Sequence, residues 1–363
     1  MFSLALKEIH FFKLKYSLIG FILFLMASLV FIVSGLAQGL SNDNIAALED
    51  MAATRFYLQE DAENRLDQSG YIIDELEEEI PRDTGWQPLL TQMYRLDAAS
   101  SETLLDVTLI PIDPEAFLYP SVIEGEDLND SDMLEIVVDR TMKADGVNIG
   151  DTLYEADQDL TFTVVGFTEN QTYRHSPIIY IAETAFYNLD LTPHQVANAI
   201  VIEEVNEELQ TDIHQTLNDG TWVEKDAIIQ AVPGHSSEQM SLMMMIAFLI
   251  IIAVFVLAAF FYILTIQKLN QFGVLKAIGA KNLFLVGTTL LQVFCLTVIS
   301  LILATAFTIF VSNILPEGMP FEFDLSLIAS YSIMILIVSL LGSLLSSIRI
   351  VKVDPQQAMG RTE

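Results

Sequence analysis

The 363-residue chain lacks the residue patterns on which most enzymes and small disulfide-rich domains depend. Its single cysteine, Cys295, lies within an apolar stretch and can form no disulfide inside the chain. There is no GxxxxGK(S/T) phosphate loop, HExxH zinc helix, GxSxG nucleophile elbow or CxxC pair, and the five histidines show no metal-ligand spacing. We therefore expect a non-catalytic protein without an intrinsic metal or cofactor. Any ATP that drives it must be hydrolysed by a separate partner.

Basic residues are scarce, with 17 Lys and Arg against 48 Asp and Glu and a formal net charge of −31. The imbalance belongs to residues 41–239, which hold 42 Asp and Glu against 8 Lys and Arg. Such a segment is a poor match for nucleic acid or for anionic lipid headgroups. We interpret the charge as a solvated surface that keeps an exposed domain soluble, and the alternative is a role in repelling a released anionic cargo.

Four long stretches carry no charge: Tyr16–Leu36, Met240–Gln267, Leu283–Pro316 and Leu325–Ile348. A helix needs roughly 20 apolar residues to cross a bilayer, so each stretch predicts a transmembrane helix. The first stretch has an alternative interpretation as a cleaved signal peptide, although its apolar run exceeds the roughly 7 to 15 residues typical of one. The polar residues of the third stretch, Gln292, Ser300 and Asn313, are expected to hydrogen-bond between helices.

The basic residues outside the acidic segment predict the orientation of the chain. They lie before the first stretch, between the second and third, and after the fourth: Lys7, Lys13, Lys15, Lys268, Lys276, Lys281, Arg349, Lys352 and Arg361. The positive-inside rule makes all of these regions cytoplasmic, and residues 41–239 then lie outside the cell.

The predicted fold class is a membrane α+β protein, with one helix and then three, and a large extracellular α+β domain between the first and second. The expected order is an amphipathic cytoplasmic helix at 1–15, transmembrane helices at 16–40, 240–267, 283–316 and 325–348, the extracellular domain at 41–239, a cytoplasmic coupling segment at 268–282, a short extracellular loop at 317–324 and a cytoplasmic tail at 349–363. Within the domain we expect strands at Leu104–Pro111, Leu134–Asp139, Leu160–Thr168 and Ile178–Ala182, and helices at Ser41–Leu48, Asp67–Ile80, Val205–Leu217 and Lys225–Val232.

The coupling segment after the second apolar stretch is short, basic and amphipathic. Phe272, Leu275 and Ile278 recur every three residues, as an apolar helical stripe does, and Gly273 and Gly279 mark close packing or a turn. A rigid helix of this kind fits a cleft on a nucleotide-binding subunit. The alternative is an interfacial linker between two membrane helices.

The stretch Phe272–Ala280 resembles the GxLKAIGA signature of the FtsX/MacB-type ABC permeases, and Val353-Asp354-Pro355 with Ala358 resembles their VDPxxAL tail. Within that family the chain is most similar to the HrtB-like heme-efflux permeases of Gram-positive bacteria. The similarity is carried by Leu6–Ile9, Ser34–Leu40, Phe260–Lys268 and Lys352–Pro355. One departure is Asn270-Gln271 before Phe272, where many relatives carry an Arg-Glu pair.

The resemblance implies an efflux pump for heme detoxification: two copies pair in the cell membrane, and an HrtA-like ATPase drives heme export by mechanotransmission. The residues implied to contact the ATPase are Phe272, Gly273, Leu275, Lys276, Ile278 and Gly279. Two other functions stay open. One is an FtsX-like transducer that activates a cell-wall hydrolase, and the other is export of a different hydrophobic substrate.

Heme is a flat apolar ring with two propionates and a ferric centre, so we expect its site at the outer membrane boundary, which the chain enters at Gln38–Asp50 and at His235–Met245. Glu238 is the candidate iron ligand, and its two copies would face each other in a dimer; the alternative is a carboxylate that stabilises a helix start. His235, Met240, Met243 and Met244 are further candidates, although methionines there also suit packing. Tyr173, Arg174 and His175 offer a phenol, a guanidinium and an imidazole in one loop, and Arg174 or Arg55 is a candidate partner for a propionate.

Overall fold

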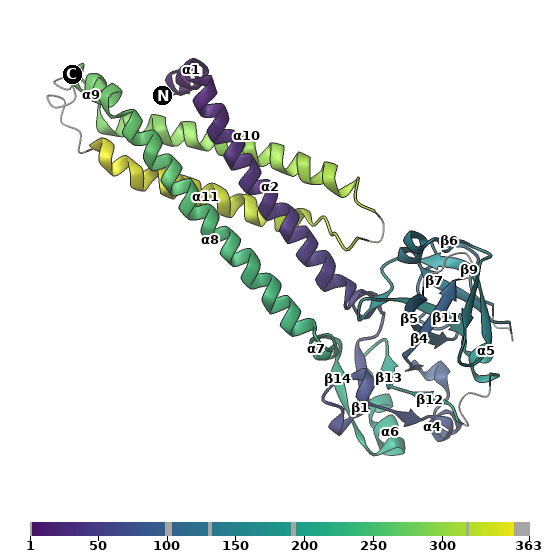
Figure 1. The fold of residues 1–363 in the computed structure, drawn as a ribbon. Coiled ribbons are helices and arrows are strands. Elements are labelled where there is room, and N and C mark those ends of the chain that lie inside the picture. Colours follow the sequence, from purple (N-terminus) through teal and green to yellow (C-terminus); the bar gives the residue numbers. More distant parts are fainter. Residues whose placement is uncertain (1, 99–103, 130–132, 190–193, 317–318, 352–363) are drawn as a thin grey trace. The chain divides into compact units, whose positions relative to one another are not determined.

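The computed structural model describes residues 2–98, 104–129, 133–189, 194–316 and 319–351, which form two compact units (Figure 1). The helical unit comprises Met1–Gln38, Ser241–Leu315 and Phe321–Glu363. The inserted domain comprises Gly39–Met240 and Pro316–Pro320. Each unit has its own core, so each is described by itself.

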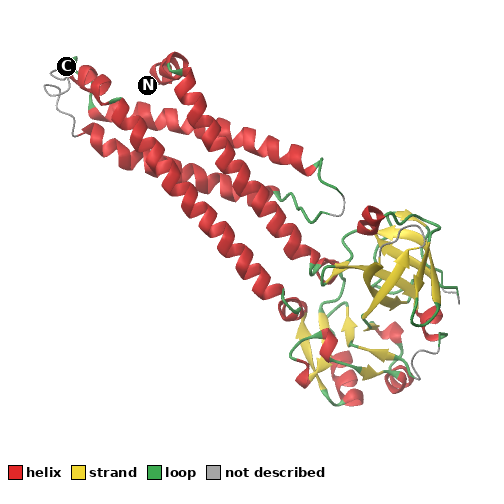
Figure 2. Cartoon of the chain, viewed as in Figure 1, coloured by secondary structure: helices red, strands yellow, loops and turns green. Residues whose placement is uncertain are grey.

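The helical unit contains no strand among its described residues (Figure 2). Its helices are α1 (Phe2–Phe11), α2 (Lys13–Asp43), α8 (His235–Gln267), α9 (Leu269–Ala277), α10 (Asn282–Ser312) and α11 (Leu325–Val351). Four of them, α2, α8, α10 and α11, are long and apolar enough to cross a membrane. These are the four spans predicted from the uncharged stretches.

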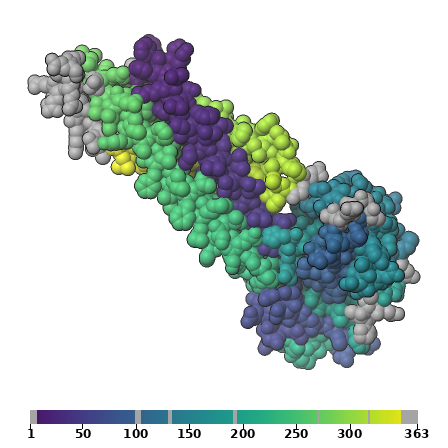
Figure 3. Space-filling view, in the orientation of Figure 1, coloured from purple at the N-terminus to yellow at the C-terminus, as the bar shows by residue number. Residues whose placement is uncertain are grey.

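The long helices pack around a shared apolar core. On α2 the buried side chains Ile19, Leu23 and Ala27 recur every four residues, so they form one face, and that face meets Phe261 of α8 and Val293 of α10. Figure 3 shows α2 and α8 side by side on one face of the unit. By contrast, only 11% of the apolar window of α8 is buried within the chain.

The expected hydrogen bonds between helices are confirmed for Gln292 and Ser300. The prediction is wrong for Asn313, whose Nδ2 donates to the carbonyl oxygen of Ile309 in its own helix at 2.7 Å. The Ser300 hydroxyl donates to the carbonyl oxygen of Gly20 at 2.9 Å, which joins α10 to α2. The Tyr16 hydroxyl donates to Gln292 Oε1 at 3.0 Å and joins the same two helices nearer the start of α2.

The larger sheet of the inserted domain closes on itself. Antiparallel and parallel pairings run in a ring through β5 (Leu104–Ile112), β4 (Gln92–Ala98), β8 (Thr152–Glu155), β9 (Leu160–Thr168), β7 (Glu135–Asp139), β11 (Ser176–Ala182) and back to β5. The short strands β6 (Glu124–Gly125) and β10 (Thr172–Tyr173) extend β9 and β11. Inward side chains such as Val107, Phe162 and Ile179 fill the interior. All four strands predicted from the sequence are confirmed.

A second, four-stranded antiparallel sheet has the order β14 (Gly220–Glu224), β1 (Arg55–Gln59), β13 (Ala199–Ile202) and β3 (Trp86–Leu89). A small ladder joins β2 (Tyr71–Ile72) to β12 (Val196–Ala197). The domain's helices are α3 (Ala46–Asp50), α4 (Asp74–Glu79), α5 (Glu183–Tyr187), α6 (Glu207–Leu217) and α7 (Lys225–Ala231), with single 3-10 turns at 60–62, 66–68 and 82–84 and a longer one at 140–145.

Two predicted helices need correction. Residues 67–80 do not form one helix: β2 begins at Tyr71, whose ring is buried and stacks on Tyr57, so only Asp74–Glu79 is helical. The expected continuation of the first membrane helix to Leu48 is interrupted by a turn after Asp43, and α3 begins at Ala46. Burial of the Tyr71 side chain therefore overrides the helix propensity of the acidic residues around it.

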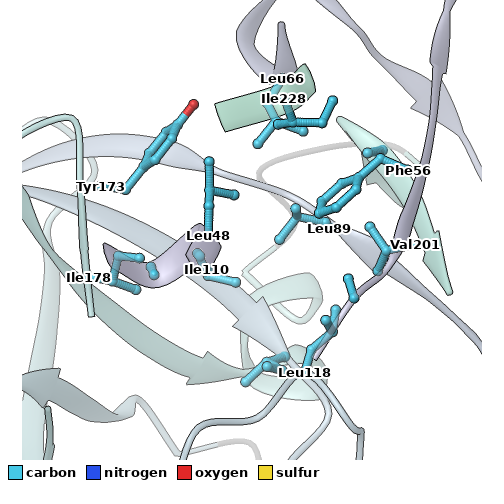
Figure 4. Packing of buried hydrophobic residues seen from close by; sticks show 14 of the residues in the cluster. Leu48, Phe56, Leu66, Leu89, Ile110, Leu118, Tyr173, Ile178, Val201 and Ile228 are labelled. Atoms are coloured by element: carbon cyan, nitrogen blue, oxygen red, sulfur yellow. The ribbon is translucent and has the colours of Figure 1, made fainter. Parts of the chain in front are cut away.

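One core cluster unites the two sheets within the inserted domain (Figure 4). It brings Phe56 and Val201 of the four-stranded sheet against Ile110 and Ile178 of the closed sheet. Fully burying an aliphatic or aromatic side chain contributes about 1.5–3 kcal/mol, so this cluster is sufficient to hold the two sheets as one domain. Tyr173 of β10 belongs to the same cluster and is labelled in Figure 4.

Candidate functional site

The tip of the β10–β11 hairpin is a two-residue turn made by Arg174 and His175. The register pairs Tyr173 with Ser176, and both tip residues have positive φ, 54° and 60°. Two successive positive values define a type I′ turn, for which Asn-Gly is the favoured sequence. A side chain in this left-handed conformation costs roughly 1 kcal/mol or more at each position, so the turn carries strain of the kind found at functional sites.

The strained turn places His175 between two carboxylates. Its Nδ1 lies 3.1 Å from Asp43 Oδ2, at the last residue of α2, and its Nε2 lies 3.3 Å from Glu238 Oε2, in the first turn of α8. Asn44 donates from Nδ2 to the same Glu238 oxygen at 3.3 Å, and the backbone carbonyl oxygen of Asn44 accepts the Arg174 backbone N–H at 2.9 Å. We call Asp43, Asn44, His175, His235 and Glu238 the His175 cluster.

The hydrogen-bonding capacity of this cluster is not fully used. A carboxylate only accepts, so both imidazole contacts are hydrogen bonds only when the His175 ring carries two protons. Asn44 and His235 are 2% and 4% exposed, and the Asn44 Oδ1 and His235 Nδ1 atoms have no partner among the described residues. Buried polar atoms are nearly always paired in folded proteins, so these two atoms are exceptions to that rule.

Three other candidate heme contacts, Tyr173, Arg55 and Arg174, already pack or pair with other residues of the inserted domain. Tyr173 is 5% exposed within the core, and burial raises the pKa of its phenol to about 12, so it is not positioned as a phenolate ligand. Arg55 pairs with Glu224 at 2.9 Å across β1 and β14. Arg174 reaches Asp67 at 3.5 Å and stays partly exposed. The Tyr173 ring fills the core, and this burial disfavours the phenol as a heme ligand.

The candidate methionines lie along the start of α8. Met240, Met243 and Met244 are 67%, 64% and 55% exposed within the chain. Their i, i+3, i+4 spacing places them on one face of the helix. They are thus available as walls for an apolar ligand or as contacts to lipid or a second chain. Among the described residues, no group of three or more His, Cys, Asp and Glu side chains is arranged to hold a metal ion.

The coupling segment forms a short helix, α9, with two different faces. Phe272 is only 3% exposed and packs against Leu285 of α10, with Leu275 beside them. On the other face Val274 and Ile278 are 52% and 77% exposed. The expected stripe is therefore divided, and Phe272 faces the helical unit.

The end of α9 agrees with the sequence. Gly279 has a φ of +98°, a conformation that favours glycine, and it ends the segment that starts at Leu269. Gly273 is buried, and Lys276 lies in the last turn. The VDPxxA tail, Val353 to Ala358, lies outside the described residues.

Comparison with known proteins identifies the family. Residues 243–355 match the FtsX-like permease C-terminal family. The chain is 31% identical over 363 residues to a protein named as hemin transport system permease protein HrtB of Staphylococcus haemolyticus, covering 99% of this chain and 100% of that one. The chain belongs to the FtsX-like permease family of ABC transporters. An HrtB of Staphylococcus epidermidis strain RP62A is 30% identical over 360 residues, covering 99% of each chain.

Solved structures add two distant neighbours of this permease. The periplasmic region of MacB from Actinobacillus actinomycetemcomitans aligns over 52% of this chain and 96% of that one, with a TM-score of 0.38 and 16% identity. The extracellular domain of the ABC-type transporter YknZ from Gram-positive bacteria aligns over 47% and 99%, with a TM-score of 0.33 and 14% identity.

Family membership makes the chain a permease subunit in a membrane, and the structure refines its candidate site. Glu238 and His175 were each predicted, and the fold brings them together. Asp43 and Asn44 were missed as individual residues, although they lie in the Gln38–Asp50 entry zone. The signal for them is the run of polar residues, Ser41 to Asn44, that follows the first apolar stretch.

Proposed function

We propose that this permease exports hemin from the membrane to the outside of a Gram-positive cell, driven by a separate HrtA-like ATPase. The observation that carries the proposal is the full-length similarity, at 31% identity, to a protein named for hemin transport. The His175 cluster supports it independently, because it places carboxylate, imidazole and amide groups at the ends of two membrane-spanning helices.

The proposed orientation follows the charge distribution. The N- and C-termini and the segment around α9 carry the Lys and Arg excess, and the inserted domain carries the acidic excess. The positive-inside rule then puts α9 in the cytoplasm beside an ATPase, and the inserted domain outside. The His175 cluster, which joins the end of α2 to the start of α8, lies on the outer side in this arrangement.

We infer that two copies of the permease pair in the membrane. The long apolar face of α8 that the chain itself leaves bare supports a contact with a second copy or with lipid. In a two-fold dimer Glu238 of each copy would approach the symmetry axis, where the two carboxylates could share one ferric centre. The methionine face, Met240 with Met243 and Met244, would then line the apolar ring of hemin.

The His175 cluster suits a ligand that must be released. A carboxylate oxygen binds ferric iron more reversibly than a pair of imidazoles, and the contact from His175 holds the Glu238 carboxylate in place. Asn44, with an unused side-chain oxygen Oδ1, and His235, with an unused ring nitrogen Nδ1, are buried beside it. A charge-assisted pair between Arg174 and a propionate would replace the long contact that Arg174 makes with Asp67.

Coupling to the ATPase is proposed for the exposed face of α9. Ile278 and Val274 lie one turn apart and are both accessible, while Lys276 adds a positive charge between them. An apolar pair of this kind fits a cleft on a nucleotide-binding subunit. Phe272 and Leu275 would support this face from behind.

Hemin titration of the detergent-purified permease, followed by absorption in the Soret region, tests the proposal. We expect a saturable shift at one hemin per dimer. Glu238→Gln should weaken binding about tenfold or more and change the spectrum, since a lost ligand or charge-assisted contact of about 1.5–3 kcal/mol corresponds to that factor.

The matched control is His194→Gln. His194 forms a similar pair with Asp74, at 2.8 Å, elsewhere in the inserted domain. It should leave the titration unchanged, whereas His175→Gln should weaken binding. Absence of any specific shift with the native chain would contradict hemin export and would favour the transducer function or another hydrophobic substrate.

A further inference from the structure

A closed network of polar side chains lies within the helical unit. Lys268 Nζ donates to Glu8 Oε2 at 2.6 Å and to Gln292 Oε1 at 2.8 Å, and Gln292 Nε2 donates to the same Glu8 oxygen at 2.7 Å. The Tyr16 hydroxyl completes the network by donating to Gln292 Oε1. The side chains of Lys268 and Glu8 are only 6% and 18% exposed.

Each member of this network comes from a different part of the unit. Glu8 belongs to α1, Tyr16 to α2 and Gln292 to α10. Lys268 is the single residue between the end of α8 and the start of α9. α1 and α9 lie at the same end of the helical unit in Figure 1. One lysine side chain therefore ties the α8–α9 junction to three other helices.

The burial of this ion pair needs an explanation beyond stability. Taking two charges out of water is costly, and a buried pair is often no more stabilising than apolar residues of the same size. What such a pair supplies is a defined geometry, because Lys268 Nζ, Glu8 and Gln292 each bond to the other two. The ammonium also lies 5.3 Å from the centre of the Tyr16 ring, where the ring face attracts a cation.

Apolar contacts reinforce the same junction. Phe272, four residues after Lys268 and thus one helical turn along, packs on Leu285 of α10, and its ring centre lies 6.0 Å from Lys268 Nζ. The beginning of α9 is therefore fixed to the bundle by both polar and apolar contacts. Its far end, with Ile278, is the exposed part.

We propose that the network of Glu8, Lys268, Gln292 and Tyr16 is the mechanical joint that makes α9 and the membrane helices move together. A displacement imposed on the exposed face of α9 is then transmitted through Lys268 to α1, α2 and α10 instead of being absorbed by a bend between α8 and α9. Lys268 and Glu8 are positioning residues in this scheme. It rests on the proposed coupling to an ATPase, but not on the identity of the substrate.

The test uses the complete complex of permease and ATPase, with a spin label at Asp226→Cys, an exposed position of α7, in a Cys295→Ser background. The distance between the labels of two copies is measured with and without ATP, beside the rate of ATP hydrolysis and the affinity for hemin. Lys268→Met and Glu8→Gln remove one charge each. Lys281→Met, at the start of α10, is the matched control.

We expect ATP to shift the label distance in the native complex and in Lys281→Met. In Lys268→Met and Glu8→Gln the fraction of complexes whose label distance shifts with ATP should fall at least about fivefold, because this factor is the lower end of typical coupling between sites. ATP hydrolysis and hemin affinity should stay native. The exchanged pair, Glu8→Lys with Lys268→Glu, should restore the shift because the Gln292 amide both donates and accepts.

Two results would overturn the proposal. One is an ATP-dependent shift that persists in both single variants or is absent from the native complex. The other is that the two single variants lose ATP hydrolysis, the label shift and thermal stability together, and that the exchanged pair does not restore them. That result would mean that the network has only a structural role. Hemin affinity is measured separately, so a native complex that does not bind hemin but shows the ATP-dependent label shift would contradict only the hemin proposal.

Discussion

Phe272 and Ile278 provide a sharp test of how α9 is used, because one helix presents them to different surroundings. Phe272 is 3% exposed against Leu285, whereas Ile278 is 77% exposed. Truncating a buried phenylalanine to alanine costs about 3–5 kcal/mol, whereas an exposed substitution usually changes stability by less than about 0.5 kcal/mol. We therefore expect Phe272→Ala, but not Ile278→Ala, to destabilise the permease.

The expected shifts are large enough to measure. For domains of this size each kcal/mol lowers the Tm by about 2–4 °C, so Phe272→Ala should unfold on the order of 10 °C lower than the native chain in detergent. Ile278→Ala should keep the native Tm and lower affinity for the ATPase about tenfold, the effect of losing an interface contact of about 1.4 kcal/mol.

The assay combines thermal unfolding of the purified chain with titration of the ATPase against immobilised permease. Leu283→Ala is a suitable control, since Leu283 is 83% exposed in the same region but lies on α10. A native Tm for Phe272→Ala, or a lowered Tm for Ile278→Ala, would show that the division of α9 into an anchoring face and a contact face is wrong.

Three further substitutions test the inserted domain and the site. Gly125→Ala should lower stability by more than about 2 kcal/mol, measured by thermal unfolding, because φ is +93° and a Cβ would lie 2.3 Å from a backbone oxygen. Arg82→Met should lower the free energy of unfolding by about 1–3 kcal/mol in the same assay, since it leaves Glu77 and Glu183 without the cation that they share. An unchanged Tm would show that this pairing does not stabilise the domain. Tyr173→Phe should leave the hemin spectrum native, and an altered Soret band would restore its phenol as a ligand.

The membrane helices were predictable because their physics is local. A long run without charge has few alternatives to a spanning helix, so α2, α8, α10 and α11 follow from composition. Strand β9 was predicted with its observed bounds, since Gly and Asp residues punctuate an alternating pattern. The helix expected at 67–80 failed because burial of Tyr71, which depends on distant residues, decided the local structure.

Long-range pairing explains what the sequence did not reveal. Strand β1 pairs with β13 and β14, which lie some 145 to 170 residues further along the chain, and no local pattern signals such a partner. The site has the same character. Glu238 and His175 are 63 residues apart, and their contact depends on the turn that Arg174 and His175 form. Turns of this type favour the sequence Asn-Gly, so Arg-His does not signal one.

The central claim is that this permease moves hemin outward at the expense of ATP. The most direct measurement reconstitutes the permease and its ATPase in vesicles loaded with hemin, with the inserted domain on the side of an apo-hemoprotein acceptor, and follows hemin transfer by the acceptor's Soret band. The account predicts ATP-dependent transfer that Glu238→Gln slows and His194→Gln does not. Transfer that is independent of ATP, or equal in native and Glu238→Gln vesicles, would contradict it.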